Sequence, residues 1–260
     1  MCTGWCILLR IEFLDTISRQ GSAFTFEDAL RASSARRETL WTILSRLEKK
    51  GWIERIGKGK YMIIPLGAEK GKYTLHEFVI GSMLAQPYCI SYWSALHHHG
   101  LTEQIPNMVF IQTTSRKKVQ KQKIFGVEYR IIRIKEEKIF GVERNWVEDT
   151  QINITDREKT LIDCLDKPQY CGGVVEVAKA LNNEKPDAER LHLYAGKIGN
   201  SAVMRRLGYL SETMGIDLQL PKIETRNYVY LDPTMPKRGK KNARWRLIIN
   251  LDEKMLGELE

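Results

Sequence analysis

The segment RETLWTILSRLEKKGWIERIGKGKYMI, residues 37–63, constrains the fold more than any other part of the chain. Its first half places Leu40, Leu44 and Leu47 at i, i+4 and i+7, which predicts a helix with one apolar stripe that ends at Gly51. Its second half holds two apolar-rich runs, WIERI and KYMII, around a Gly-Lys-Gly turn, and this pattern predicts a β-hairpin. A helix followed by a basic hairpin is typical of the second half of a winged helix-turn-helix.

The residues before this segment predict the first half. Apolar residues at helical spacing predict a first helix from Trp5 to Arg19. Thr25 with Asp28 forms a capping-box pattern that opens a short second helix, Phe26 to Arg31. The pair Ser33-Ser34 then offers an N-cap for the third helix.

Basic and hydroxyl side chains lie largely off the leucine stripe of the third helix. Eight basic and three acidic residues lie between Ser34 and Lys60, and they account for the whole excess of positive charge before residue 73. These residue types contact phosphates and base edges. The sequence therefore predicts that the third helix enters the DNA major groove and the hairpin touches the flanking backbone, through Arg36, Arg37, Thr39, Thr42, Arg46, Lys49, Lys58 and Lys60. The alternatives are a winged helix that binds protein, and cations that are simply solvated.

Composition limits the class of protein. A chain of 260 residues is long for one domain, so we expect a winged helix at 1–72 and a larger α+β domain at 73–260. The net charge of +9 favours a polyanionic partner. Five cysteines without a C-x-x-C pair predict neither disulfides nor zinc, and so a reducing, cytoplasmic location. We read no signal peptide and no apolar run long enough for a membrane span.

The stretch YCISYWSALHHHGLTEQIP, residues 88–106, raises the question of a metal or catalytic site. Cys89, Tyr92, Trp93 and Leu96 follow a helical stripe and Gly100 fits a C-cap, so we expect an amphipathic helix. Three consecutive histidines fan over about 200° of such a helix and cannot converge on one ion. We therefore expect structural or surface histidines, with no metal and no catalytic residue.

Several longer segments resemble a known family. The pattern of residues 37–63 is similar to the recognition helix and wing of bacterial and archaeal regulators. SYWSALHHHGLTEQIP, VFIQTTSRKK and ITDREKTLIDCLDKPQYCGGVVEVAKAL, in this order, resemble the AbiEi family, the antitoxin component of type IV toxin-antitoxin systems. The resemblance continues through GNSAVMRRLGYLSETMG and LDPTMPKRGKKNARWRLIINL, so it covers essentially the whole chain, although the C-terminal part is longer than in shorter members.

That resemblance implies a division of roles. The winged helix would bind operator DNA and repress its own operon. The C-terminal domain would counter a nucleotidyltransferase-like toxin without forming a stable complex with it. The protein would be non-enzymatic, with no cofactor.

The rest of the chain predicts strands and then helices. Met108 to Gln112 reads as a strand, followed by the basic run SRKKVQKQK, and KIFGVE occurs twice, as two similar strands or by chance. Thr155 with Glu158 predicts the cap of a helix that ends at Pro168. Further helices are expected after Gly173, at Ala188 to Ile198 and at Ser201 to Met214.

Two expected C-terminal strands, Tyr228 to Leu231 and Arg244 to Leu251, form a pair joined by the loop DPTMPKRGKKNA. This loop and its exit are either a surface for a partner or nucleic acid, or a solvated hairpin tip. The basic residues concerned are Lys237, Arg238, Lys240, Lys241, Arg244 and Arg246.

Two other functional classes compete with the antitoxin. A standalone transcription factor would use the C-terminal domain to sense a ligand or to dimerise. A metal-dependent nuclease would need a carboxylate cluster, but Glu136-Glu137-Lys138 has no suitable upstream aspartate and Asp163 with Asp166 has no third ligand. No glycine-rich phosphate loop is present either, so we expect no enzymatic activity.

Overall fold

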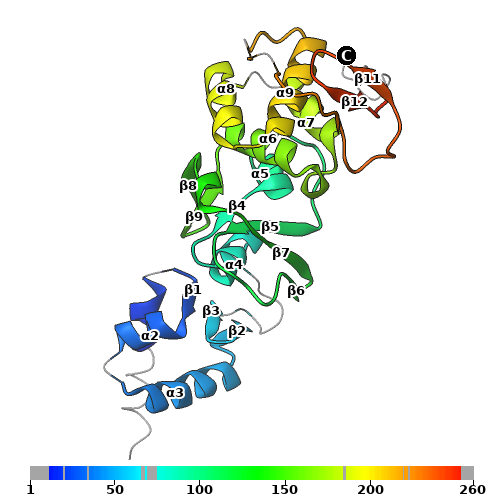
Figure 1. Cartoon of the computed structure of the whole chain (residues 1–260). Coiled ribbons are helices and arrows are strands. Elements are labelled where there is room, and N and C mark those ends of the chain that lie inside the picture. The colour runs from blue at the N-terminus through cyan, green and yellow to red at the C-terminus, as the bar shows by residue number, and fades with distance from the viewer. Residues whose placement is uncertain are drawn as a thin grey trace, which may run out of the picture.

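The N-terminal part of the chain is a winged helix-turn-helix. The computed structural model describes residues 12–19, 21–33, 35–65, 68, 75–183, 186–218, 220–221 and 223–252, and residues 12–18 are helical. The beginning of the predicted Trp5–Arg19 helix lies outside the described residues. The elements that follow are β1 (Ala23–Thr25), α2 (Phe26–Ala32), α3 (Arg37–Lys49), β2 (Ile53–Gly57) and β3 (Lys60–Ile63), with β3 antiparallel to and between the other two strands (Figure 1).

The capping box at the start of α2 is confirmed. The Asp28 N–H donates to Thr25 Oγ1 at 3.2 Å, and the Thr25 N–H donates to the Asp28 carboxylate at 2.8 Å. The predicted Ser33-Ser34 cap of α3 is wrong for Ser33, which ends α2 in extended conformation; Ser34 lies outside the described residues. The N-cap of α3 is Arg36, because the chain uses the intervening residues to turn between the two helices.

The leucine stripe of α3 builds the core of this domain. Leu40, Leu44 and Leu47 are fully buried and pack with Ile17, Phe24 and other apolar residues of the first helix and the small sheet. Gly51 follows α3 with φ +72°, the left-handed conformation that glycine adopts at a helix end. The predicted helix and hairpin are therefore both present.

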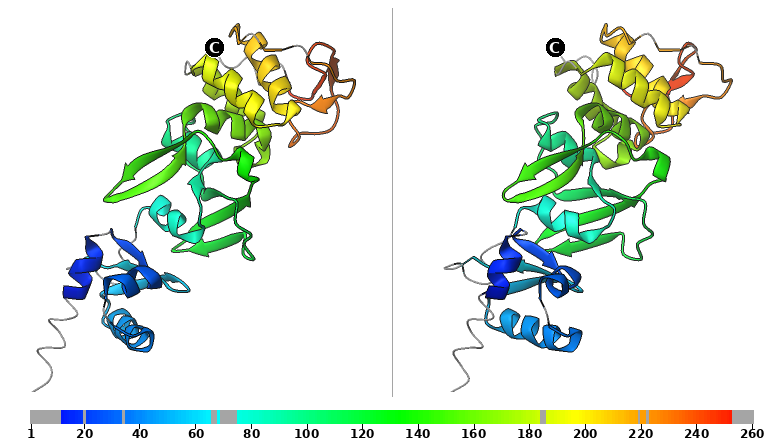
Figure 2. Two further views of the ribbon diagram at one scale, coloured as in Figure 1. Left: turned by 60° about the vertical axis from the view of Figure 1, so that its left-hand side comes forward. Right: turned by 90° about the vertical axis from the view of Figure 1, so that its left-hand side faces the viewer.

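A six-stranded sheet follows the winged helix. Its order is β6-β7-β5-β4-β9-β8, with β5 parallel to β7, β4 parallel to β9 and the other pairs antiparallel. The strands are β4 (Cys89–Ile90), β5 (Met108–Thr113), β6 (Lys121–Ile124), β7 (Val127–Arg133), β8 (Val142–Val147) and β9 (Thr150–Thr155). The sheet lies between the winged helix and a group of helices (Figure 2).

The two faces of this sheet pack against different layers. Ile90, Ile111 and Ile154 are buried on one face with apolar residues of α4 (Glu77–Leu84). Ile56 and Met62 of the wing strands join the same cluster, so the winged helix packs against this face. Alternate residues along the strands point to the opposite face, which packs against α5 and α6.

The histidine stretch differs in part from its prediction. Cys89 lies on β4 and not on a helix; α5 (Tyr92–His98) begins after it, with Gly100 at φ +69°. Strand β4 pairs with β5 and β9 but has only two residues, which is too short to show an alternating apolar pattern in the sequence. The helical spacing of the apolar residues therefore predicted a helix that begins too early. His99 Nε2 contacts the Thr155 carbonyl at 2.7 Å, and His98 Nε2 contacts the Asn145 amide at 3.1 Å.

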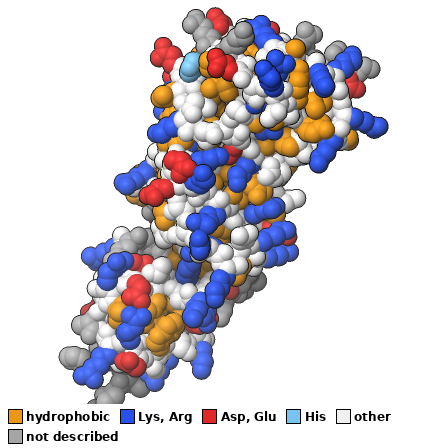
Figure 3. Space-filling model, in the orientation of Figure 1, with side chains coloured by type: hydrophobic (Ala, Val, Ile, Leu, Met, Phe, Trp, Pro, Cys, Tyr) orange, Lys and Arg blue, Asp and Glu red, His pale blue; other side chains and the backbone are white. Residues whose placement is uncertain are grey.

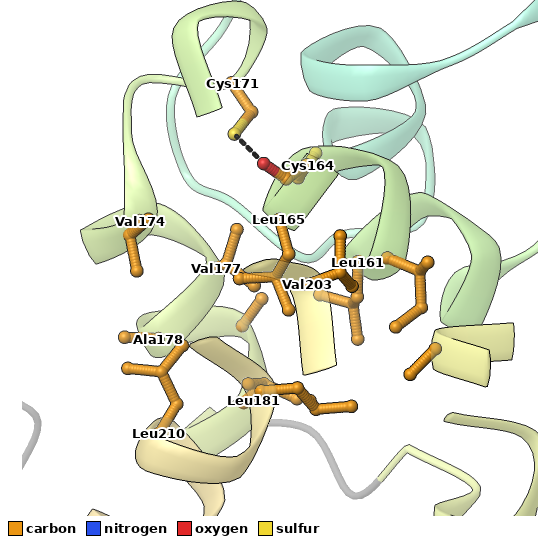
Figure 4. Packing of buried hydrophobic residues seen from close by; sticks show 14 of the residues in the cluster. Leu161, Cys164, Leu165, Cys171, Val174, Val177, Ala178, Leu181, Val203 and Leu210 are labelled. Atoms are coloured by element: carbon orange, nitrogen blue, oxygen red, sulfur yellow. Dashed lines mark hydrogen bonds between the residues drawn. The ribbon is translucent and has the colours of Figure 1, made fainter. Parts of the chain in front are cut away.

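The helices after the sheet share the largest apolar core. They are α6 (Arg157–Asp166), α7 (Val174–Asn183), α8 (Ala188–Lys197) and α9 (Ser201–Thr213), and side chains from α6, α7 and α9 meet in Figure 4. The predicted cap of α6 is one residue early. Asp156 is the N-cap and accepts from the Lys159 N–H at 2.7 Å, because the Thr155 hydroxyl instead pairs with that of Thr160.

The C-terminal strands pair differently from the prediction. β10 (Val229–Tyr230) is parallel to β12 (Leu247–Ile249), and the expected loop contributes β11 (Lys240–Asn242), which is antiparallel to β12. Strand partners depend on contacts between distant segments, which a local pattern does not encode.

The two KIFGVE segments have different structures. The first makes the turn between β6 and β7, with Phe125 and Gly126 at φ +47° and +86°; the second runs from a 3₁₀ turn into β8, with Phe140 buried. The mixed α+β class is confirmed. The boundary between 1–72 and 73–260 stays a prediction, because residues 69–74 lie outside those described. Within the described part of the chain, no helix is long and apolar enough to cross a membrane.

Candidate nucleic-acid interface

The solvent face of α3 carries most of the predicted DNA-binding residues. The fully buried Leu40, Leu44 and Leu47 turn the opposite side of the helix outward. The side chains exposed there include Thr39, Thr42, Arg46 and Lys49. No ion pair engages Arg46 or Lys49 with any other described residue, so both cations are available to an external anion.

The two arginines at the start of α3 have different surroundings. Arg36 is the N-cap, is exposed, and makes no side-chain cap hydrogen bond. Arg37 donates to the Glu27 carboxylate at 2.9 Å and its guanidinium lies 5.0 Å from the centre of the Phe26 ring. Arg37 therefore joins α3 to α2, and Arg36 is the freer of the pair.

Trp41 is an exposed residue of α3 that was not among the predicted DNA-binding residues. Its ring stacks on Phe26 with centroids 4.2 Å apart, yet 43% of the residue stays exposed. An exposed tryptophan on α3 offers an apolar contact for the methyl group of thymine or for a sugar. Trp41 lies outside the stripe of Leu40, Leu44 and Leu47, and this position in the sequence could have identified it as a surface residue.

The two lysines of the wing, Lys58 and Lys60, differ in their exposure to solvent. The turn is only two residues long, with Lys58 exposed and Gly59 at φ +66°. Lys60 begins β3 and is half-buried. Burial lowers the pKa of the Lys60 ammonium, and the positive charge of Lys117 lowers it further.

The effect of the Lys117 charge on Lys60 indicates that a second basic segment lies near the wing. Lys117 belongs to the run SRKKVQKQK, which follows β5 and continues into β6. A surface hollow of about 230 Å³ is lined by Arg116, Lys117 and Arg133 of the sheet domain. Lys and Arg side chains, in blue, spread over both domains in Figure 3. The run is visible in the sequence, but its place beside the wing is not.

The C-terminal basic residues form a separate surface. Lys237, Arg238, Lys240 and Lys241 are exposed, whereas Arg244 donates to the Glu212 carboxylate at 2.6 Å. Strands β11 and β12 lie at the opposite end of the molecule from α3 (Figure 1). The structure does not bring these two predicted surfaces together.

Asp163 and Asp166, which were considered for metal binding, are engaged elsewhere. Asp163 is bonded to Lys159, and Asp166 accepts from Lys138 and Asn200 at 2.7 Å each. Among the described residues, His, Cys, Asp and Glu side chains do not gather in any group of three that could hold an ion. The arrangement of α3, the wing and the adjoining loop therefore supports anion binding, and the acidic residues stabilise the helical layer.

A comparison with protein-family models finds a match in the N-terminal part of the chain. Residues 12–64 match the family model AbiEi_4, described as "Transcriptional regulator, AbiEi antitoxin". This segment is the winged helix from its first helix to the end of β3, about a fifth of the chain. The predicted resemblance is confirmed for these residues, and it stays a prediction for the remainder. A search of curated proteins found no match.

Proposed function

We propose, from the AbiEi-type regulator domain at residues 12–64, that the protein is a DNA-binding antitoxin that represses its own type IV toxin-antitoxin operon. The proposal rests on one observation: the domain that matches the regulator family exposes cations on α3 and the wing that have no ion-pair partner among the described residues. In a winged helix the third helix occupies the major groove while the wing follows the backbone. Arg36 and Arg46 would read bases or phosphates from α3, and Lys58 would contact phosphate from the wing.

The sheet domain would extend the contact with DNA. Lys117 is close enough to Lys60 to lower its pKa, so a duplex lying along the wing would also meet the 115–123 run. Phosphate between the two ammonium groups would relieve their repulsion. Each additional phosphate contact makes binding more dependent on salt.

The remainder of the chain would supply the antitoxin activity. The resemblance of residues 91–251 to the AbiEi family supports a role in countering a nucleotidyltransferase-like toxin, without a stable complex. No chemical reaction and no cofactor is part of this function. A toxin-like gene beside this one, together with loss of growth when only that gene is expressed, would support the assignment.

Fluorescence anisotropy tests the DNA-binding half directly. The full-length protein is titrated onto a labelled duplex from its own upstream region and onto a scrambled duplex, at two salt concentrations. We expect Arg46→Ala to lose about 1 to 3 kcal/mol on the native duplex and to reduce the preference over the scrambled one. Lys58→Ala should weaken both duplexes alike and lower the salt slope by about 1.

The matched control is Arg226→Ala, which removes an exposed arginine of the C-terminal part. It should bind the native duplex as the wild type does. Equal and weak binding of the wild type to both duplexes would overturn the operator-binding proposal. The basic face would then be a generic or solvated surface, or a surface for a protein partner.

A standalone, ligand-sensing regulator is the second candidate, because the sheet domain contains a cavity of about 340 Å³. The two candidates differ in the toxin assay. Rescue of growth by this protein in cells expressing the neighbouring toxin-like gene supports the antitoxin, and operator binding without rescue supports the regulator.

A further inference from the structure

The cavity of about 340 Å³ lies on the face of the sheet opposite α4. Two cross-strand pairs form the floor of the cavity. Arg144 lies opposite Asn153 across β8 and β9, and Cys89 lies opposite Gln112 across β4 and β5. None of these residues belongs to the proposed DNA-binding surface. A volume of this order accommodates a small organic molecule.

Gln112 gives the floor a fixed polar group. It is 3% exposed, and its Nε2 donates to the Asp163 carboxylate at 2.8 Å. Asp163 is itself bonded to the fully buried Lys159. The bond to Asp163 therefore holds the carboxamide in one orientation, and Gln112 lines the cavity.

Two further groups at the cavity are free to bind a ligand. Asn153 is half-buried, and its side-chain amide makes no hydrogen bond within the described part of the chain. Arg144 is exposed and has no carboxylate partner in the described ranges. Burial raises the pKa of the Cys89 thiol, so this residue is a neutral part of the floor. Arg144 is thus the only formal charge among the lining residues, and it favours an anion.

The walls and rim of the cavity are apolar. Tyr88 and the buried Phe140 contribute aromatic rings to the lining. Ile139 and Val142 also line it, although 39% and 41% of their surfaces are exposed. Large aliphatic side chains exposed beside a cavity favour a ligand that covers them.

We propose that this cavity binds a small organic anion with a flat apolar body. The carboxylate, or a similar group, pairs with Arg144, and the ring lies between the apolar walls. Gln112 and Asn153 bind polar atoms on the edge of the ring.

Ligand-observed NMR on the full-length protein tests the proposal with three probes that share one ring. Indole-3-acetate carries an anion, indole-3-acetamide is neutral, and tryptamine carries a cation. We expect saturable binding of indole-3-acetate at least about tenfold tighter than that of tryptamine, because only the anion forms an ion pair with Arg144, whereas the ammonium group of tryptamine is repelled.

Two variants locate the binding in the cavity. Arg144→Gln should weaken indole-3-acetate by about tenfold and leave indole-3-acetamide within about twofold. Val142→Trp fills the mouth from an exposed strand position, so it should abolish binding of both compounds while the circular dichroism spectrum stays that of the wild type. Arg226→Gln is the control for charge and should bind as the wild type does.

Either of two results would overturn the proposal. The first is no saturable binding of indole-3-acetate to the wild type. The second is binding that Arg144→Gln and Val142→Trp both leave unchanged, which would place the probe elsewhere on the protein. Neither result depends on whether the protein binds DNA.

Discussion

Lys60 carries a positive charge that the native structure disfavours. Burial and the neighbouring Lys117 both lower its pKa, whereas an unfolded chain would hold the lysine near about 10.4. Between the lowered pKa and that value, the unfolded state binds more protons than the native state. The contribution of Lys60 to the free energy of unfolding therefore rises as pH rises through this window, and below it the charged group costs stability.

Removing the neighbouring charge should move the titration of Lys60 upward. Lys117→Ala eliminates the smaller of the two causes, so we expect the pKa of Lys60 to rise but to stay below its unfolded value, since burial is unchanged. Carbon-13 NMR of labelled lysines, titrated between about pH 8 and pH 12, measures this shift. An unaltered titration of Lys60 would show that the wing and the 115–123 run are not adjacent in solution. Lys118→Ala serves as the control for an exposed neighbour.

At the scale of elements, the contact of the C-terminal strands with α9 depends on one glycine. A Cβ added at Gly208 would lie 2.2 Å from the Trp245 ring, far inside a normal contact. The indole is also fixed by its Nε1, which donates to Glu212 at 2.5 Å. The close approach of a ring to the helix backbone requires glycine at this position.

Gly208→Ala and Gly196→Ala should have opposite effects on stability. Gly208→Ala must displace Trp245, so we expect a loss of about 1 to 3 kcal/mol in the free energy of unfolding. Gly196 lies on α8 with no atom within 4 Å of an added Cβ, so alanine there should stabilise the helix by up to about 1 kcal/mol. Urea unfolding followed by circular dichroism measures both. A Gly208→Ala protein as stable as Gly196→Ala would mean that Trp245 does not pack on α9.

The elements also show what the sequence could and could not predict. The helices α3 and α9 begin and end within one or two residues of their predicted bounds, because their apolar period and end signals are local. The strand at Cys89 was missed, and the parallel pairing of β10 with β12 was not foreseen, because both depend on segments distant in the chain. For the same reason, the cations of α3 could be predicted from a local pattern, whereas the position of Lys117 near the wing could not.

At the scale of the whole molecule, the β8–β9 hairpin connects the cavity to the winged helix. Arg144 and Asn153 lie along its strands, and Asp149 in its turn accepts from the Ser22 hydroxyl at 2.5 Å. The Ser22 carbonyl in turn accepts from the Ile63 N–H at 2.9 Å, at the end of the wing strand β3. A ligand that shifts the hairpin therefore acts on the element that carries the wing.

This connection predicts a coupling between the proposed ligand and DNA. If both proposed sites bind, saturating indole-3-acetate should change the Kd for the operator duplex by about fivefold or more, and the duplex should change the Kd for indole-3-acetate by the same factor. Asp149→Ala removes the contact with Ser22, so the factor should fall to within about twofold while each ligand still binds. Anisotropy with and without indole-3-acetate measures the first change, and NMR titration with and without duplex measures the second. Glu224→Ala, an exposed carboxylate on another segment, should leave the factor unchanged. A wild-type protein that binds both ligands with no effect of either on the other would refute the coupling and leave the two sites independent.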